Sequence, residues 1–369
     1  MNPIDCCRHS ISQEPSIAII MLNWNGFNDS VDCLNSIRNV SYQNYKIVLV
    51  DNGSANEEGS RLKEAFPEVH LISNLINRGF AGGNNDGINW ALDKGFEYIL
   101  NLNNDCLVEK DWLTNLIHGI KTARADFATS RIMYYPDTDK ICSDGDGLLP
   151  DGEGIVLNHL STAPESNEIK SIFGACGACS IYSAACLEDV KVFEKQFFDE
   201  LYFAYFEDVD LGIRVNAKHY KGVSVPDSVV YHKGSQSAGF RSSFQIFHLE
   251  KNRILNEILN YPIWLIPMGE FYYFVKVIVR FLKKVTFTQG SRVERSIRPK
   301  ETYNVFTVMI KSRLWILLNI REIWKNRQER KHRGLINKKV FKHFYWDCPN
   351  LFKLRDYFMN WYRTSFFPR

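Results

Sequence analysis

The chain has 369 residues, 45% of them hydrophobic, which is enough for one large domain with a buried core and an extension. Its net charge is only +3, but residues 1–275 hold 22 Lys and Arg against 36 Asp and Glu, and residues 276–343 hold 19 against 4. An acidic body followed by a basic segment indicates an anionic partner for that segment, either a nucleic acid or a membrane surface.

The N-terminus and the cysteines argue against a secreted protein and against a zinc or redox protein. The sequence MNPIDCCRHSISQEPS has no apolar segment, so it does not read as a secretory signal, and we expect residues 1–15 to be a disordered lead. The nine cysteines follow no repeating frame. Cys176 and Cys179 form a lone C-x-x-C among small residues, which is more typical of close packing than of a zinc or redox site. Reduced cytoplasmic thiols are the expected state.

From residue 16 to residue 105 the pattern alternates between strand and helix. Short β-rich runs are separated by segments with helical spacing, the first of which offers Asp29 or Ser30 as an N-cap. Strands separated by helices of this length predict parallel βαβ units. The expected strands lie within residues 16–25, 45–54, 69–74 and 96–105, and the expected helices within 29–40, 57–66 and 82–95.

Three of these four strands end in polar clusters, which comprise Asn23 and Asn25, Asp51 and Asn52, and Asn103-Asn104-Asp105. In an open α/β sheet, ligands bind in the crevice beyond the carboxyl ends of the strands. The recurrence of polar residues at one edge therefore predicts a binding rim.

The second half of the chain is less regular. Residues 130–170 are rich in Gly, Asp and Pro and are expected to cross the surface as loops. Residues 172–190 read as a strand followed by a helix, residues 200–220 as an aromatic stretch leading into a helix, and residues 221–234 as a late strand ending on His232.

After about residue 245 the chain becomes apolar, aromatic and basic. Its longest uncharged run is shorter than the roughly 20 apolar residues that a membrane-spanning helix needs. Helices with apolar aromatic faces and basic polar faces lie in the membrane interface, which is the favoured interpretation; a helical cap on the main domain is the alternative. A nucleic-acid platform is disfavoured, because the aromatic residues are mixed with long aliphatic runs.

Six motifs in order resemble those of the family-2 glycosyltransferases with the GT-A fold, in particular a rhamnosyltransferase-like branch. They are LNWNGFNDSVDCLNSI, IVLVDNGS, NRGFAGGNNDGINWAL, YILNLNNDCLV, FDELYFAYFEDVDLGIR and VVYHKGS. The resemblance implies an α/β, Rossmann-like GT-A domain over residues 16–245, with a mixed, mostly parallel sheet and flanking helices. Residues 246–369 would form a basic, aromatic-rich helical extension that associates with a membrane.

The resemblance assigns a divalent metal, Mg²⁺ or Mn²⁺, to the polar turn after the fourth strand. Such a cation takes oxygen ligands and neutralises the diphosphate of a sugar nucleotide as it leaves. Asp105 would bind the metal, His232 would be its second ligand, and Asn103 or Asn104 would contact the ribose or a phosphate. Many members carry Asp-X-Asp here, so the neutral Asn103 leaves only one charged ligand. The alternatives are an ordinary Asn-rich turn and a structural histidine.

The resemblance also places the nucleotide-sugar donor along the other strand tips. Asp51 would accept the imino hydrogen of uracil or thymine, and Asn23 and Asn25 would frame the base. Arg78, in a glycine-rich loop before a helix, would meet the phosphates, and Asn85 would also reach the donor. A turn or capping role for Asp51 and a plain surface position for Arg78 remain open.

The motif FEDVDLG supplies the expected chemistry. Transfer with inversion needs a base on the acceptor hydroxyl, and a carboxylate shielded from water has a raised pKa that suits this task. The family motif makes Asp208 the base and Glu207 an orienting group, while Asp210 is expected to cap the helix containing Arg214. Capping by Glu207 or Asp208 is the structural alternative.

Together these features predict an inverting glycosyltransferase that moves a sugar from a dTDP or UDP donor to a lipid-linked or polysaccharide acceptor in surface glycan assembly. L-rhamnose is the favoured candidate for this sugar. It would sit in the cytoplasm, on the inner face of the cell membrane, without a nucleic-acid partner. The alternatives are transfer of galactose, glucose or an N-acetylhexosamine from UDP, and a non-catalytic nucleotide-binding or membrane-scaffold protein on the same fold.

Overall fold

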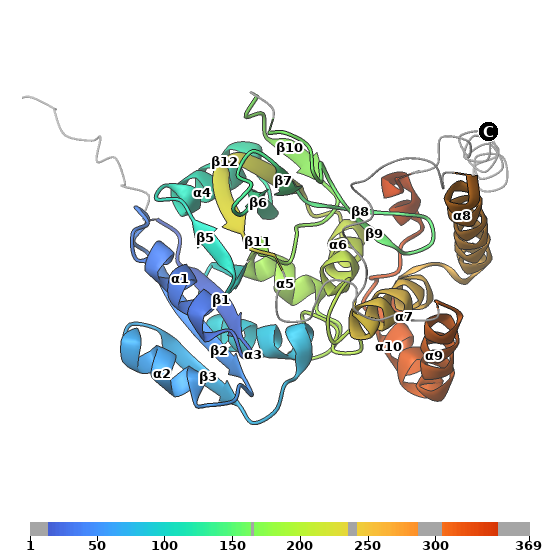
Figure 1. The fold of residues 1–369 in the computed structure, drawn as a ribbon, viewed down its shortest axis with the longest axis horizontal. Coiled ribbons are helices and arrows are strands. Elements are labelled where there is room, and N and C mark those ends of the chain that lie inside the picture. Colours follow the sequence, from blue (N-terminus) through green and yellow to red (C-terminus); the bar gives the residue numbers. More distant parts are fainter. Residues whose placement is uncertain (1–13, 164–165, 235–241, 287–304, 346–369) are drawn as a thin grey trace, which may run out of the picture.

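A computed structural model describes residues 14–163, 166–234, 242–286 and 305–345. Nearly all of the predicted N-terminal lead and the last part of the predicted helical extension lie outside these residues. Within them the chain forms a sheet domain covered by helices, with four further helices gathered at one end of the molecule, on the right in Figure 1.

The first half of the sheet is entirely parallel, as the alternation of strands and helices predicted. The order β4-β1-β2-β3 puts the earliest strand at its centre. The register sets Asn23 beside Asp51 on one side of β1 and Leu22 beside Asn103 on the other, so the polar strand tips share one edge. The strands are β1 (Ile17–Asn23), β2 (Tyr45–Asn52), β3 (His70–Asn74) and β4 (Tyr98–Asn103).

The second half of the sheet is mixed. β11 runs antiparallel to both β4 and β6, β12 runs parallel to β6, and β10 and β5 pair antiparallel with β12. A separate hairpin is formed by β8 and β9. The strands are β5 (Cys106–Val108), β6 (Phe127–Tyr134), β7 (Ile141–Ser143), β8 (Asp146–Leu148), β9 (Gly154–Val156), β10 (Lys170–Ile172), β11 (Cys179–Ser183) and β12 (Gly222–His232).

Helices cover both faces of this sheet. Successive residues of β1 point to opposite faces, so Ile19 belongs to the apolar cluster that includes residues of α1, α2 and α4, and Ile20 belongs to the cluster that includes residues of α3, α5 and α6. Gly83 and Gly87 bring α3 close to the sheet: a Cβ on Gly83 would lie 2.4 Å from Leu22 Cδ1. The helices are α1 (Phe27–Ile37), α2 (Glu58–Ala65), α3 (Gly79–Asp93), α4 (Trp112–Ala123), α5 (Ala184–Val190) and α6 (Glu207–Ala217).

Two local expectations were wrong. The N-cap of α1 is Gly26, and Ser30 lies inside the helix, where its hydroxyl bonds Asn23. Residues 130–170 do not only cross the surface: they include β7 to β10, and Asp144 and Asp146 are buried. The composition of this segment could not predict the burial, because a buried carboxylate needs a partner and the partner lies elsewhere in the sequence. For Asp144 it is Arg131, whose Nε is 3.2 Å away.

The C-terminal helices form a layer against the sheet domain. α7 packs against α6 on one side and against α9 and α10 on the other, which is visible at the right of Figure 1. Among the described residues, no helix has the length and apolar character needed to cross a membrane. The helices are α7 (Ser243–Asn260), α8 (Ile266–Thr286), α9 (Val305–Leu318) and α10 (Ile320–His332), with short 3-10 turns at Ile263–Leu265 and Lys338–His343.

Candidate active site

Asn23 and Asp51 form a buried pair where β1 and β2 end. The Asn23 amide nitrogen lies 3.4 Å from Asp51 Oδ1 and donates at 3.0 Å to both Ser54 Oγ and Glu58 Oε2. Asp51 is only 8% exposed, so its carboxylate is oriented by neighbouring groups rather than by solvent. Glu58, which the sequence reasoning missed, places a second buried carboxylate on the same amide.

The asparagines around this pair fasten loops together. Asn25 has a positive φ of 51°, and its Oδ1 accepts the Ala55 N–H at 2.8 Å, which joins the loops after β1 and β2. The Asn104 amide donates to Ser30 Oγ at 2.9 Å and so turns toward α1. Asn103 ends β4 and is partly buried, and its backbone N–H donates to the carbonyl of Ala178.

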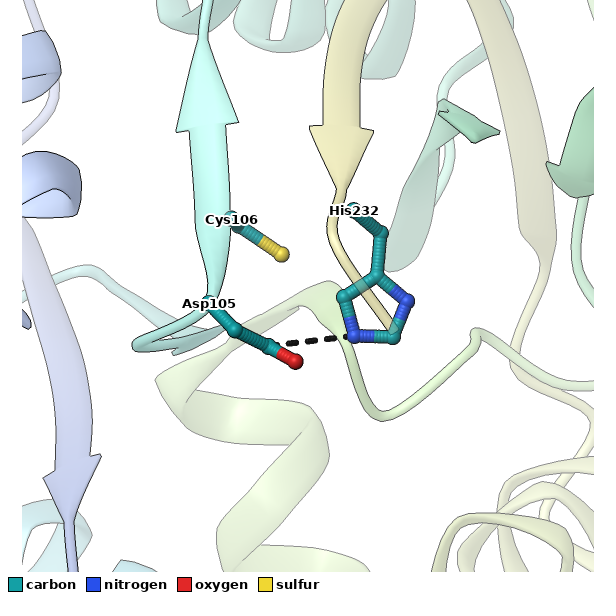
Figure 2. Close-up of side chains that lie close together, drawn as sticks. All are labelled: Asp105, Cys106 and His232. Carbon is teal, nitrogen blue, oxygen red and sulfur yellow. Dashed lines mark ion pairs between the residues drawn. The ribbon is translucent and has the colours of Figure 1, made fainter. Parts of the chain in front are cut away.

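Asp105 and His232 meet across the neighbouring strands β5 and β12. The antiparallel register places Cys106 beside His232, and the Lys233 N–H donates to the Asp105 carbonyl at 3.0 Å. As a result the Asp105 carboxylate and the imidazole point toward each other, with Oδ1 3.1 Å from Nε2 (Figure 2). Nε2 is buried and makes no hydrogen bond of good geometry despite this short distance.

Asp105 raises the pKa of the His232 imidazole to about 10 against the effect of burial, and a divalent cation would take the place of the proton that the pair shares. A carboxylate oxygen and an unsatisfied imidazole nitrogen converge on one point, and such groups bind Mn²⁺ or Mg²⁺ when substrate oxygens complete the shell. The Cys106 sulfur lies in the same cluster (Figure 2). Burial raises the pKa of this thiol well above its usual value, so it remains protonated and is a poor ligand.

Glu207 and Asp208 begin α6 and are linked to the rim by one short loop. The Gly177 N–H donates to Asp208 Oδ2 at 3.0 Å, while the next carbonyl, that of Ala178, accepts the N–H of Asn103. The structure therefore brings the acidic motif of α6 next to the polar turn that follows β4.

The two carboxyl groups have different electrostatic environments. Burial, and then the charge of Asp208, raise the pKa of Glu207 well above its usual range, and its Oε2 has no hydrogen-bond partner. Burial also raises the pKa of Asp208, but the N–H groups of Gly177 and Val209 oppose this rise. Asp208 is therefore the member of the pair that ionises more readily.

Asp146, a third buried carboxyl group, was missed in the sequence because it lies in the Gly- and Asp-rich segment. Its carboxylate, that of Asp208 and the sulfur of Cys176 offer ligand atoms within 4.8 Å of one another. Burial and then the charge of Asp208 raise the pKa of Asp146 well above its usual range. The neutral Asp146 carboxyl group next to Asp208 lowers the pKa of Asp208 and so favours its ionised form.

Asp210 does not cap α6, contrary to expectation. The N-cap position is occupied by Phe206, and Asp210 is a fully buried residue of the first helical turn. Its carboxylate pairs with Arg214 Nε at 2.9 Å and with Arg330 of α10 at 2.5 Å. The charges of these two guanidinium groups outweigh burial and hold the pKa of Asp210 below its usual range.

Arg78 and Asn85 lie at the start and in the middle of α3. Arg78 pairs with Asp86 and with Glu200, whose Oε1 is 3.0 Å from Nη2. Asn85 is buried: its Oδ1 accepts the N–H of Phe198 at 2.9 Å, and its Nδ2 donates to the Phe198 carbonyl at 2.8 Å. Asn85 Nδ2 also lies 3.3 Å from Glu200 Oε1, the oxygen that Arg78 contacts, so the two residues meet through Glu200. The amide of Asn85 is otherwise occupied by the chain before α6.

Residues 18–191 match the family model described as glycosyl transferase family 2. This match covers just under half of the chain, which over these residues is similar to family 2 glycosyltransferases. The hexosyltransferase Agl10 of low-salt glycan biosynthesis in Haloferax volcanii is 23% identical over 259 residues, covering 68% of this chain and 78% of that protein. Glycosyltransferase GlyG of Streptococcus pneumoniae is 24% identical over 239 residues, covering 62% and 74%.

The fold of the chain is similar to that of GT-A enzymes. The crystal structure of GalNAc-T7 with UDP, GalNAc and Mn²⁺ superimposes with a TM-score of 0.59 at 13% identity, over 97% of this chain and 59% of that one. A similarity at this level of identity establishes the fold alone. It confirms the predicted mixed sheet with flanking helices and the helical C-terminal part.

Proposed function

We propose that the protein is an inverting hexosyltransferase that uses a pyrimidine-diphosphate sugar. The observation that carries this proposal is the position of three acidic elements along one edge of the sheet. Asp51 lies at the end of β2, Asp105 follows β4, and Asp208 begins α6 one loop away. These positions suit a nucleoside, a metal-bound diphosphate and an acceptor hydroxyl in that order.

In the donor site, the Asp51 carboxylate would accept the imino N–H of uracil or thymine while Asn23 holds it in place. Trp24 is 40% exposed beside this pair and offers an aromatic face to the base. Asp105 and His232 would hold a divalent cation, which supplies the positive charge that the departing diphosphate needs. Arg78 would act on the phosphates only by exchanging one of its present carboxylate partners for them.

Asp208 would remove the proton of the acceptor hydroxyl as the new glycosidic bond forms on the face opposite the leaving diphosphate. Its two oxygens each accept one backbone N–H, which fixes the carboxylate while leaving a lone pair for the acceptor. Glu207, whose raised pKa favours the neutral form, would orient the acceptor rather than accept its proton. Rhamnose from dTDP-rhamnose is the first donor to test, and the acceptor would be a lipid-linked or polysaccharide glycan.

The test is a donor screen. The purified protein is incubated with UDP-, dTDP- and GDP-sugars, with and without Mn²⁺, and nucleotide release is followed. We expect release from dTDP or UDP donors only. Release from GDP donors alone, or from none of the panel in the presence of cell-extracted glycan acceptors, would contradict the proposal.

We also propose that the outer faces of α8 and α9 contact an anionic membrane on the cytoplasmic side, where a lipid-linked acceptor would be found. Their exposed apolar residues recur with helical spacing, and α9 also exposes the cation Lys311 between Ile310 and Leu314. The inner face of this layer does cap the domain, so the two interpretations of the extension are compatible. The exposed apolar residues are Phe271, Phe274, Val277, Ile278, Ile310, Leu314, Leu317 and Leu318.

Flotation with vesicles tests this surface. We expect the protein to float with phosphatidylglycerol-containing vesicles and to float less with pure phosphatidylcholine. The double variant Leu317→Glu, Leu318→Glu should stay at the bottom of the gradient. Leu160→Glu, a change at a comparably exposed leucine on a distant loop, should float like wild type. Wild type that remains at the bottom with both vesicle types would refute the membrane surface.

A further inference from the structure

The segment that leads into the acidic motif of α6 is conformationally strained. Phe203, Tyr205 and Phe206 have φ values of 65°, 69° and 62°, in the left-handed region that side chains other than glycine seldom adopt. Each such residue costs on the order of 1–3 kcal/mol, so the conformation persists only where surrounding contacts enforce it. Because Glu207 follows directly, the placement of both carboxylates depends on these contacts.

The first of these contacts comes from α7, in the C-terminal layer. The Asn252 side chain is fully buried, and its Nδ2 lies 3.1 Å, 2.8 Å and 2.5 Å from the carbonyl oxygens of Tyr202, Ala204 and Tyr205. Lys251, its neighbour, donates to the Leu201 carbonyl at 2.8 Å. One amide therefore fixes the backbone on both sides of the left-handed Phe203.

The second contact comes from α10, which holds the helix after the loop. Arg330 is fully buried and donates to Asp210 Oδ1 and to Asn260 Oδ1, each at 2.5 Å, and to Asp199. Asp210 stands two residues after Asp208, and Asp199 precedes the strained loop. A single guanidinium group thus joins the segments before and after the motif. Without it, Asp199 would lose this buried ion pair and Asp210 would lose one of its two guanidinium partners.

We infer that the C-terminal helices α7 and α10 position the Glu207 and Asp208 carboxylates, with Asn252 and Arg330 as positioning residues for the transfer reaction. This inference rests on the proposed function for the role of Asp208. It makes the C-terminal layer a part of the catalytic unit, and a chain truncated near residue 245 would lose both contacts.

Asn252→Ala is the more informative change, because removal of Arg330 breaks the buried ion pairs with Asp199 and Asp210 and is expected to prevent folding. A matched control is Asn256→Ala, one turn further along α7. Asn256 is also fully buried, and its Nδ2 donates to the Gly152 carbonyl at 2.8 Å. Its Oδ1 accepts the Tyr202 hydroxyl at 2.7 Å, so its contact with the segment is to a side chain and not to a backbone carbonyl. Both variants remove a buried amide, so both should lower the melting temperature.

The two variants should differ in kinetics and in hydrogen exchange. We expect Asn252→Ala to lower kcat by about 10²-fold, as a displacement of roughly 1 Å can do, with unchanged KM for the donor. Amides of residues 203–210 should exchange faster than in wild type. The control should keep kcat per folded molecule and keep slow exchange in this segment. Equal kcat and equal exchange in the two variants would overturn the inference.

Hydrogen exchange also separates this inference from the proposed function. If the wild-type protein transfers no sugar in the donor screen, the proposed function fails, whereas exchange over residues 203–210 still decides whether Asn252 holds the segment. Arg330→Lys, which retains the charge but loses the planar fork, provides a second test. This variant should fold, and its loss of activity should again appear as a lower kcat with an unchanged KM for the donor.

Discussion

Replacing Asp208 by Asn tests the proposed chemistry most directly, and the structure supplies the magnitudes. Oδ1 of Asp208 accepts the Val209 N–H at 2.8 Å, and Oδ2 accepts the Gly177 N–H at 3.0 Å. Asparagine has nearly the same shape, but its NH₂ group must face one of these donors. One N–H then loses its acceptor, which should lower the free energy of unfolding by about 1–3 kcal/mol.

The expected loss of activity is much larger than this loss of stability. Without proton transfer to a positioned base, kcat should fall by roughly 10²–10⁴-fold. Donor affinity should not change, because the proposed donor contacts lie at Asp51 and Asp105 rather than on α6. The assay combines denaturant unfolding, calorimetric titration with the donor nucleotide, and transfer rates at saturating donor.

Glu207→Gln is the matched control. Burial and the neighbouring carboxylate raise the pKa of Glu207 well above its usual range, so at neutral pH the substitution exchanges one neutral side chain for another. Its kcat should fall far less than that of Asp208→Asn. Near-wild-type transfer by Asp208→Asn would refute the assignment of the base and direct attention to Glu207, while loss of donor binding would make Asp208 a binding residue.

Three further predictions concern the metal, the pH profile and the packing of α3. Turnover should require Mn²⁺ or Mg²⁺, and Asp105→Asn should nearly abolish it; full activity in excess EDTA would remove Asp105 from the metal site. The base works when ionised, so the rate should rise with pH through the pKa of Asp208. Asp146→Ala removes a neutral carboxyl group that lowers this pKa and should move the acidic limb of kcat/KM to higher pH, whereas Asp146→Asn, which supplies a neutral donor at the same place, should move it little. A limb that stays in place in Asp146→Ala, or moves to lower pH, would show that Asp146 does not lower the pKa of Asp208. Gly83→Ala should lower the free energy of unfolding by about 1–3 kcal/mol, measured with urea, because its Cβ would lie 2.4 Å from Leu22 Cδ1; unchanged stability would mean that α3 can shift freely.

The parallel half of the sheet could be predicted from the sequence because its signals are local. A strand followed by a helix of ordinary length recurs three times before the fourth strand, which predicts parallel pairing with the strand ends at one edge. The structure then shows the register that sets Asn23 beside Asp51. The acidic motif of α6 was likewise visible, since adjacent carboxylates behind an aromatic run are unusual in a plain surface helix.

The sequence by itself thus determined the alternating architecture, the polar rim at the strand ends and the identity of the acidic residues. Only the tertiary structure decided which of these groups face one another. Asp146 joins Asp208 from a segment that composition assigned to loops, and Asp210 meets Arg330 across 120 residues of chain. Residues so far apart become neighbours through packing of the whole chain, and burial then changes their pKa values, which no local pattern encodes.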